Sequence, residues 1–134
     1  MENAMNVCFD IDGTITEKPE FFSLLSRAVK KSGGKVFVLT SRTRSPETME
    51  ATKLELSGYG IEYDDLNMLP DKAEAERTCP LKELDWYQKF IFQKVDYCKA
   101  NQVDVYFDDE MKVIDLFKRF LPDVQVFQIH PKGV

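Results

Sequence analysis

The sequence predicts an α/β protein built on a mainly parallel five-stranded sheet with helices on both of its faces. Short apolar runs alternate with helical patterns along all 134 residues, which is the order of elements found in parallel sheets. The apolar runs are nearly uninterrupted, as expected of strands that are buried on both faces. Polar residues follow several of these runs directly, at the sheet edge where proteins of this class bind ligands.

Five short apolar runs, each ending at polar or turn-forming residues, are expected to form the strands. They are NVCFDI (6–11), KVFVLT (35–40), DLNML (65–69), VDVYF (103–107) and VQVFQI (124–129). DLNML has the fewest apolar residues of the five, and Pro70 bounds it. The strands therefore recur along the whole chain rather than in one part of it.

The first two helical patterns carry recognisable start and stop signals. Pro19 opens the first pattern, which stops at the glycine pair 33–34. Ser45 is a candidate cap for the second helix, and Pro46 takes its first helical position. This second helix is expected over 45–58, ending at a glycine.

The remaining chain continues the same alternation. Helices are expected over 84–101 and 110–121, whereas the charged segment 71–83 is expected to form a loop or an irregular short helix. No repeat or linker interrupts the pattern. Residues 1–134 are therefore expected to form a single domain.

The composition is that of a soluble globular protein, with 43% hydrophobic and 31% charged residues. No apolar run approaches the roughly 18 residues of a membrane span, and no secretory signal is visible, so a cytoplasmic location is expected. The three cysteines lack the C-x-x-C spacing of a zinc site and cannot form a closed disulfide set. The net charge of −5 argues against non-specific binding to nucleic-acid backbones.

Acidic and hydroxyl side chains close three of the predicted strands. Asp10 and Asp12 close the first strand, Thr40 closes the second, and the pair Asp108 and Asp109 closes the fourth. Because parallel strands end at one edge of a sheet, these side chains are expected to converge. Several carboxylates without histidine or cysteine suit Mg²⁺ and make zinc ligation unexpected.

Two structural explanations compete with this site. Asp-x-Asp-Gly is a common turn composition, and Asp109 alone could cap the helix that follows it. An EF-hand is excluded, because positions six and twelve counted from Asp10 hold Ile15 and Phe21 instead of glycine and glutamate. A turn alone does not explain a second acidic pair at the same sheet edge.

These motifs resemble those of the haloacid dehalogenase-like (HAD) phosphohydrolase superfamily. Its first motif, D-x-D-G-T, is matched by Asp10, Ile11, Asp12, Gly13 and Thr14. Its second motif, a hydroxyl residue ending a strand, is matched by Thr40, and its acidic fourth motif by Asp108 and Asp109. The resemblance implies a three-layer Rossmann-like fold and a Mg²⁺-dependent phosphatase that hydrolyses a phosphomonoester.

The family's third motif is a lysine, for which helix geometry favours Lys94. With a rise of about 1.5 Å per helical residue and 3.3 Å per strand residue, Lys94 comes level with the end of the fourth strand. It also shares an apolar helix face with Ile91 and Cys98. Lys89 is high enough but points elsewhere, and it stays open as the alternative. A lysine that snorkels from an apolar face is the structural explanation.

The resemblance also implies roles for the catalytic pair. Asp10 would attack phosphorus and form an aspartyl-phosphate. Asp12 would protonate the leaving oxygen and then deprotonate the hydrolytic water. Gly13 would allow the sharp turn after the strand, and Thr14 would orient the acid/base group.

The same resemblance implies the metal and phosphate ligands. Mg²⁺ would be held by Asp10, Asp108, Asp109 and the main-chain carbonyl of Asp12, with one of the acidic pair acting through water. Phosphoryl oxygens would be bound by Thr40, Lys94 and the Gly13–Thr14 turn.

No cap domain is expected, because neither the stretch before Thr40 nor residues 70–83 are long enough to fold separately. The site would therefore be open, and its substrate would be a phosphorylated small molecule or a nucleic-acid or protein end. Ser41 and Arg42, together with Arg44, are candidate substrate contacts, although a solvated loop explains them equally well. A monomer is the default oligomeric state.

Two other functions stay open. A receiver-like module would bind Mg²⁺ and accept a phosphoryl group without turnover, but such a module needs no D-x-D-G-T motif. A catalytically silent HAD scaffold would lack one of the expected side chains, and all of them are present here. Asp12 is the residue that separates a phosphatase from a receiver.

Overall fold

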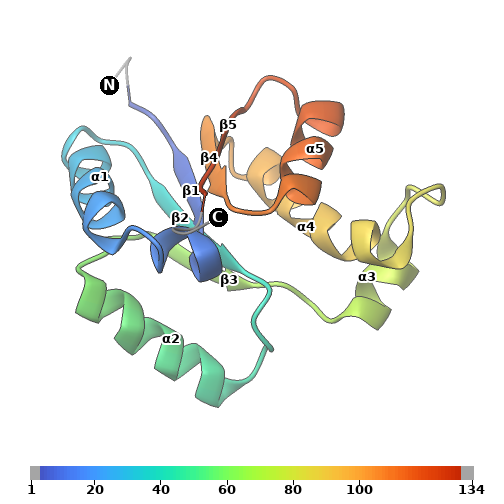
Figure 1. Cartoon of the computed structure of the whole chain (residues 1–134), viewed down its shortest axis with the longest axis horizontal. Coiled ribbons are helices and arrows are strands. Elements are labelled where there is room, and N and C mark those ends of the chain that lie inside the picture. The colour runs from blue at the N-terminus through green and yellow to red at the C-terminus, as the bar shows by residue number, and fades with distance from the viewer. Residues whose placement is uncertain (1–3, 131–134) are drawn as a thin grey trace.

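Five strands form one parallel sheet at the centre of the molecule (Figure 1). The computed structural model describes residues 4–130. The strands are β1 (Val7–Asp10), β2 (Val36–Thr40), β3 (Asp65–Met68), β4 (Val105–Asp108) and β5 (Gln125–Gln128). They lie in the order β3-β2-β1-β4-β5, and every neighbouring pair is parallel. The predicted α/β fold with a five-stranded sheet is confirmed.

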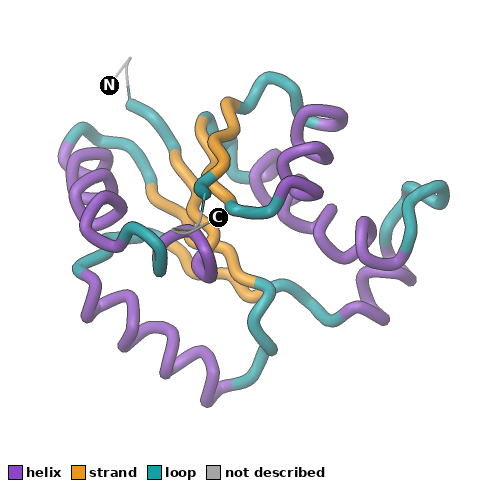
Figure 2. Tube along the Cα trace, in the orientation of Figure 1, coloured by secondary structure: helices purple, strands orange, loops and turns teal. Residues whose placement is uncertain are grey.

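Helices cover both faces of the sheet, as Figure 2 shows. They are α1 (Pro19–Lys31), α2 (Pro46–Tyr59), α3 (Lys72–Thr78), α4 (Trp86–Ala100) and α5 (Met111–Phe120). Helices α1 and α2 pack on one face, and α3, α4 and α5 lie on the other. The chain moves outward from β1 through β2 to β3 and then returns to β4, so the strand order reverses between β1 and β4. Ligands bind at such a reversal in open parallel sheets.

The first strand ends one residue earlier than its apolar run predicts. Ile11–Ile15 forms an irregular turn in which Asp12 is extended and Gly13 has a φ of +84°. Glycine adopts this left-handed conformation without the steric cost that a Cβ atom would add. The turn separates the two aspartates, because Asp10 stays in the sheet while Asp12 lies in the turn.

Helix α2 begins as predicted and ends one residue later. The Ser45 hydroxyl accepts a hydrogen bond from the Thr48 amide at 3.1 Å, and Pro46 occupies the first turn. The helix runs through Gly58 and ends before Gly60, whose φ of +76° terminates it. The sequence pattern therefore identified the helix but chose the wrong glycine as its end.

The segment between β3 and α4 contains the short helix α3 and, within residues 4–130, no separate cap domain. Asp71 caps α3 by accepting a hydrogen bond from the Glu74 amide at 2.8 Å. Asp85 and Gln88 form a reciprocal capping box at the start of α4. Among the described helices, none combines the length and the apolar character required to span a membrane.

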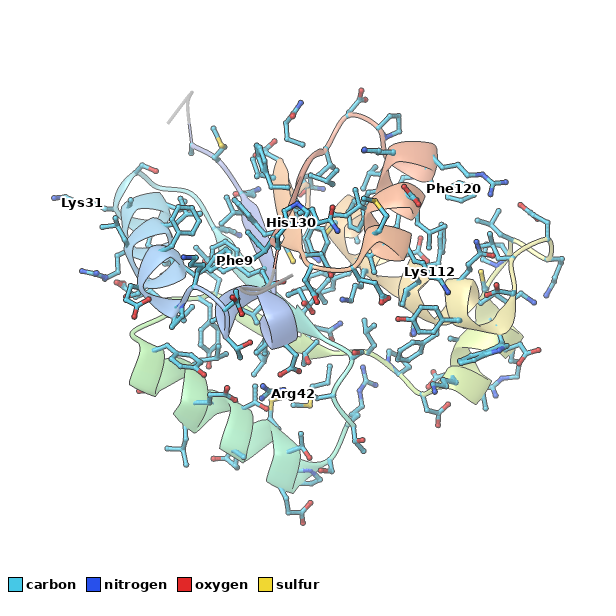
Figure 3. The ribbon with its side chains drawn as sticks, in the orientation of Figure 1. Phe9, Lys31, Arg42, Lys112, Phe120 and His130 are labelled. Atoms are coloured by element: carbon cyan, nitrogen blue, oxygen red, sulfur yellow. The ribbon has the colours of Figure 1, made fainter. Side chains whose placement is uncertain are left out.

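Each face of the sheet has its own apolar core. On the α1 face, Phe9, Phe22 and Phe107 pack edge to face, with ring centroids 4.8 to 5.7 Å apart. Figure 3 shows Phe9 in the interior and Lys31 at the periphery. On the opposite face, Tyr106 stacks on Phe117 at a centroid distance of 4.4 Å.

The Phe22 ring is fully buried in this aromatic cluster, so Phe22→Ala should create a cavity. We expect the free energy of unfolding to fall by about 3–5 kcal/mol. Urea denaturation measures this loss. Leu24→Ala, two residues away on the same helix, is the matched control, because Leu24 is 62% exposed and should change stability by about 0.5 kcal/mol or less. Equal losses in the two variants would contradict this core assignment.

Candidate active site

The carboxyl ends of three adjacent strands bring the predicted acidic edge together. Asp10 is the last residue of β1, Asp108 is the last residue of β4, and Thr40 ends β2. Because Phe9 pairs with Phe107 in the parallel ladder, Asp10 and Asp108 follow at the same level of neighbouring strands. Sheet register alone therefore places two acidic side chains next to each other.

Asp10, Asp108 and Asp109 form a compact acidic triad. One carboxylate oxygen from each lies within 4.8 Å of the others, a spacing at which the three could hold a metal ion. Asp10 and Asp108 are buried, while Asp109 is half-buried at the start of the following loop. Oxygen is the only donor type in the triad, which suits a hard cation such as Mg²⁺.

Lys94 joins two members of the acidic triad from helix α4. Its Nζ lies 3.1 Å from Asp10 Oδ1 and 2.9 Å from Asp108 Oδ2, and only 4% of the residue is exposed. The alternative lysine, Lys89, is partly exposed and is not among the residues that line the acidic cavity. Helix geometry thus selected the lysine that contacts the acidic groups.

Burial and charge crowding perturb the acidic triad. Burial raises the pKa of Asp10 to about 8; the Lys94 ammonium opposes this rise, and the Asp108 carboxylate adds to it. Burial, and then the charge of Asp108, also raises the pKa of Asp109. For Lys94, burial lowers the pKa, but the two carboxylates outweigh this effect and raise it. One lysine therefore compensates three carboxylates incompletely, and a divalent cation would relieve the remaining repulsion.

Asp108 is held rigidly by three donors. Oδ2 accepts hydrogen bonds from Lys94 and from the Tyr106 hydroxyl at 2.5 Å, and Oδ1 accepts one from the Glu110 amide at 3.0 Å. Tyr106 was not identified from the sequence. It lies two residues before Asp108 on the same strand, so the period-2 alternation of strand side chains would have placed it on the same face.

Asp12 lines the same cavity as the acidic triad but pairs with Arg42 instead of Lys94. The Arg42 guanidinium grips both Asp12 oxygens, at 2.9 and 2.8 Å, and also donates to Glu55 at 2.7 Å and to the Thr52 hydroxyl at 3.1 Å. Hydrogen bonding to Arg42 lowers the pKa of Asp12. Arg42 was predicted only as a candidate substrate contact, because its carboxylate partners lie 13 and 30 residues away in the sequence.

The turn after β1 supports the two neighbouring carboxylates. The buried Thr14 hydroxyl donates to Asp10 Oδ2 at 3.1 Å, so it orients Asp10 rather than Asp12. Gly13 passes directly beneath Asp109, since a Cβ atom at Gly13 would lie 2.6 Å from Asp109 Cγ. This turn therefore requires glycine both for its backbone conformation and for the space above it.

A cavity of about 470 Å³ opens over the acidic triad. Its lining residues are Asp10, Asp12, Ser41, Tyr87, Ile91, Lys94, Asp108, Asp109, Glu110 and Met111. Thr40 is not among them; it is 1% exposed, and its hydroxyl accepts a hydrogen bond from the Arg42 amide at 3.1 Å. Glu110, which the sequence did not single out as a site residue, accepts a hydrogen bond of 2.5 Å at its Oε2 from the Tyr87 hydroxyl at the cavity rim.

Comparison with known proteins identifies structures of similar fold but no family. No family model and no curated protein sequence matches this chain. One chain of the Pnkp1/Rnl/Hen1 complex aligns with all of it at a TM-score of 0.65 and 21% identity, and one of the Pnkp1/Rnl/Hen1 RNA repair complex aligns with 98% of it at 0.64 and 22%. The chain spans 48% and 44% of those two chains, so it matches about half of each.

A third similar structure is a universal stress protein in complex with cAMP, with a TM-score of 0.51 and 11% identity. The alignment covers 94% of this chain and 96% of that protein. All three similar structures share a parallel α/β fold with this chain. Because each is less than 25% identical in sequence, the similarity extends to the fold alone. The chemistry of the site has to be argued from its own side chains.

Replacing Gly13 by alanine should disrupt the acidic triad. The added Cβ would be strained at a positive φ and would displace the Asp109 carboxylate, so we expect Mg²⁺ affinity to fall about 10-fold or more. Isothermal titration with Mg²⁺ measures this change. Gly58→Ala is the control, because a Cβ there meets no atom within 4 Å and should leave Mg²⁺ affinity as in the wild type. Unaltered affinity in Gly13→Ala would show that Asp109 does not hold the metal.

Proposed function

We propose that this protein is a Mg²⁺-dependent phosphatase that hydrolyses a phosphomonoester through an aspartyl-phosphate on Asp10. The main support for this proposal is that Asp10, Lys94, Asp108 and Asp109 line one cavity at the strand-order reversal. Resemblance of the D-x-D-G-T and acidic-pair motifs to the HAD phosphohydrolases supports the same reaction. The soluble-domain composition agrees with a cytoplasmic enzyme.

The acidic triad fits Mg²⁺ as its cofactor. Its donors are carboxylate oxygens with no histidine or cysteine among them, and their spacing of 4.8 Å or less allows shared ligation. Asp10, Asp108 and Asp109 would hold the ion, together with the main-chain carbonyl of Asp12. When bound, Mg²⁺ supplies positive charge that lets an anionic phosphate approach an anionic nucleophile.

Asp10 is suited to act as the nucleophile. Its carboxylate lines the cavity, and Thr14 and Lys94 each bind one of its oxygens, which fixes the direction of attack. An Asp10 oxygen forms a bond to phosphorus while the bond from phosphorus to the leaving oxygen breaks. Lys94 stays close enough to neutralise charge that develops on the phosphoryl group.

Asp12 is suited to proton transfer because its environment differs from that of Asp10. Arg42 holds both of its oxygens, and the Asp12 side chain is 62% exposed at the cavity. In the first step Asp12 gives a proton to the leaving oxygen; in the second it takes one from the water that hydrolyses the aspartyl-phosphate. Arg42 acts as a positioning residue here and favours the ionised form needed in the second step.

The substrate panel should include phosphorylated RNA ends beside small molecules. Two of the similar structures are chains of complexes that contain Pnkp1, Rnl and Hen1, and one of these is described as an RNA repair complex. The proposed site is open, so a large substrate would not be excluded by a cap. Non-specific binding along a nucleic-acid backbone is not proposed, given the net charge of −5.

The decisive variant is Asp10→Asn, which removes the nucleophile. With Mg²⁺ and a panel of phosphomonoesters, we expect phosphate release to fall roughly 10⁴-fold or more while the fold persists. Asp115→Asn, on the exposed side of α5, is the matched control and should retain wild-type release. Turnover by the wild type would exclude a receiver-like module and a silent scaffold. Failure of the wild type to hydrolyse any member of the panel would overturn the phosphatase proposal.

Arg42→Lys keeps the positive charge but removes the bidentate hydrogen bonding to the two Asp12 oxygens. Because lysine cannot bind both carboxylate oxygens in a fixed plane, we expect kcat to fall about 10- to 100-fold with a smaller change in KM. Steady-state kinetics on the best substrate measure both constants. Arg27→Lys is the control, since within residues 4–130 the Arg27 side chain donates to the Ser23 carbonyl of its own helix. A rise in KM alone would instead make Arg42 a substrate contact.

A further inference from the structure

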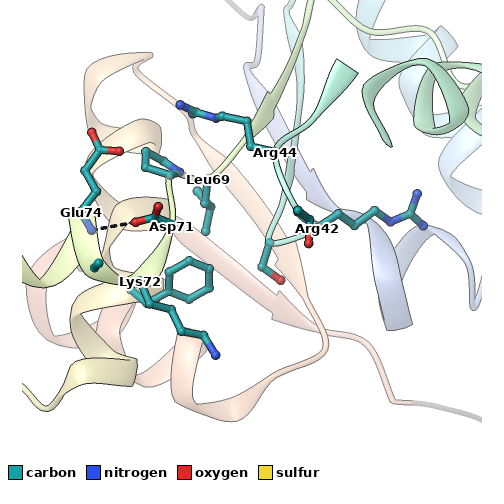
Figure 4. A pocket seen from close by; sticks show the side chains of 11 residues that line it. Arg42, Arg44, Leu69, Asp71, Lys72 and Glu74 are labelled. Carbon is teal, nitrogen blue, oxygen red and sulfur yellow. Dashed lines mark hydrogen bonds between the residues drawn. The ribbon is translucent and has the colours of Figure 1, made fainter. Parts of the chain in front are cut away.

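A second cleft of about 610 Å³ lies beside the acidic cavity, between the loop after β2 and the segment that leads into α3 (Figure 4). Ser41 lines both the cleft and the cavity. Arg42 also lines the cleft, while the Asp12 that it grips lines the cavity. The two spaces therefore adjoin at Ser41, and Arg42 connects the wall of the cleft to Asp12, the group proposed to protonate the leaving oxygen.

The inner surface of this cleft is apolar. Leu69 and Phe90 are 3% and 7% exposed, and Pro70 and Ala73 extend the same surface toward the rim. Figure 4 shows Leu69 between the Asp71–Lys72 segment and the loop that carries Arg42 and Arg44. Burying this surface against an apolar ligand lowers the free energy of binding, whereas its apolar side chains provide no hydrogen bonds to the hydroxyls of a polyol.

Charges at the rim cancel one another. Arg44 donates to the Met68 carbonyl, and Lys72 lies over the Trp86 ring, 4.8 Å from its centroid. The acidic side chains of Asp71 and Glu74 line the same cleft and balance these two cations. Arg42 is already paired, with Asp12 and with Glu55. The cleft therefore provides no net charge with which to attract a polyanionic group.

We propose that this cleft binds the leaving group of the phosphomonoester and that this group is an uncharged, mainly apolar alcohol. The proposal rests on the phosphatase function assigned to the acidic cavity. The phosphoryl group occupies the cavity, its ester oxygen faces Asp12, and the alcohol passes Ser41 into the cleft. A volume of 610 Å³ falls in the usual range for small-molecule sites, which is about 300–1,000 Å³.

Two primary-alcohol esters test the preference while keeping the reacting bond alike. We expect KM for 2-naphthylmethyl phosphate to be at least about 10-fold lower than KM for glycerol 1-phosphate. The same preference should appear in a binding measurement with phosphonates, which are not hydrolysed. In the presence of Mg²⁺, 2-naphthylmethylphosphonate should bind more tightly than methylphosphonate. Equal constants within each pair, in an enzyme that turns over both esters, would overturn the cleft assignment and leave the phosphatase function standing.

Bulky substitutions on opposite walls should abolish this preference. Ala73→Trp and Thr43→Trp each place a bulky ring in the cleft. We expect each to reduce the preference in KM for the naphthylmethyl ester over the glycerol ester at least 10-fold. The inhibition constant of inorganic phosphate should change less, because phosphate binds in the acidic cavity. Glu76→Trp, which is exposed on α3 outside the cleft, should keep wild-type selectivity. Thermal unfolding checks that each variant is folded, and a folded variant on either wall suffices for the test.

The outcomes separate the two proposals. If the naphthyl phosphonate binds preferentially and loses that preference in Ala73→Trp, but no ester is hydrolysed, the cleft stands and the phosphatase function falls. If esters are hydrolysed and folded variants with tryptophan at 43 or 73 retain wild-type selectivity, the cleft assignment falls alone.

Discussion

The buried ammonium group of Lys94 is the interaction on which the candidate site depends. It lies within 3.1 Å of Asp10 and 2.9 Å of Asp108, and so ties α4 to the ends of β1 and β4. Removing one partner from a buried ion pair typically costs about 3–5 kcal/mol, because the remaining charge is left uncompensated. The strand-order reversal places the two carboxylates side by side, and the Lys94 ammonium reduces the repulsion between them. Without this contact, the central strands would end in unopposed negative charge.

The two aspartates of the first motif differ through their surroundings. Asp10 is buried against Lys94 and Thr14, whereas Asp12 is largely exposed and held by Arg42. The turn at Gly13 creates this difference, because it ends the strand after one aspartate and directs the other toward α2. One short segment thereby supplies one shielded and one exposed carboxylate, which are the two environments that the proposed nucleophile and proton carrier require.

Interactions around the site extend well beyond the motif residues. Tyr106 and the Glu110 amide fix Asp108, and the ring of Tyr106 is itself held by stacking on Phe117. Glu55 in turn accepts hydrogen bonds from Arg42 and from the Tyr59 hydroxyl. These contacts anchor the reactive groups to the apolar cores of both sheet faces. Preorganised groups of this kind lose little free energy on reorganisation during reaction.

Periodicity and turn signals in the sequence predicted the alternation of strands and helices along the chain and the sheet edge at which the acidic residues meet, whereas the spatial order of the strands came from the folded structure. Helix geometry also favoured Lys94 over Lys89, because both lie high enough along the helix but only Lys94 shares the apolar face with Ile91 and Cys98. Local pattern could not reveal the Arg42–Asp12 ion pair or the cleft next to Ser41. Those depend on how a loop, a helix and a turn distant in sequence pack against one sheet edge. Side-chain direction at such junctions is set by tertiary packing and charge pairing, which only the folded structure decides.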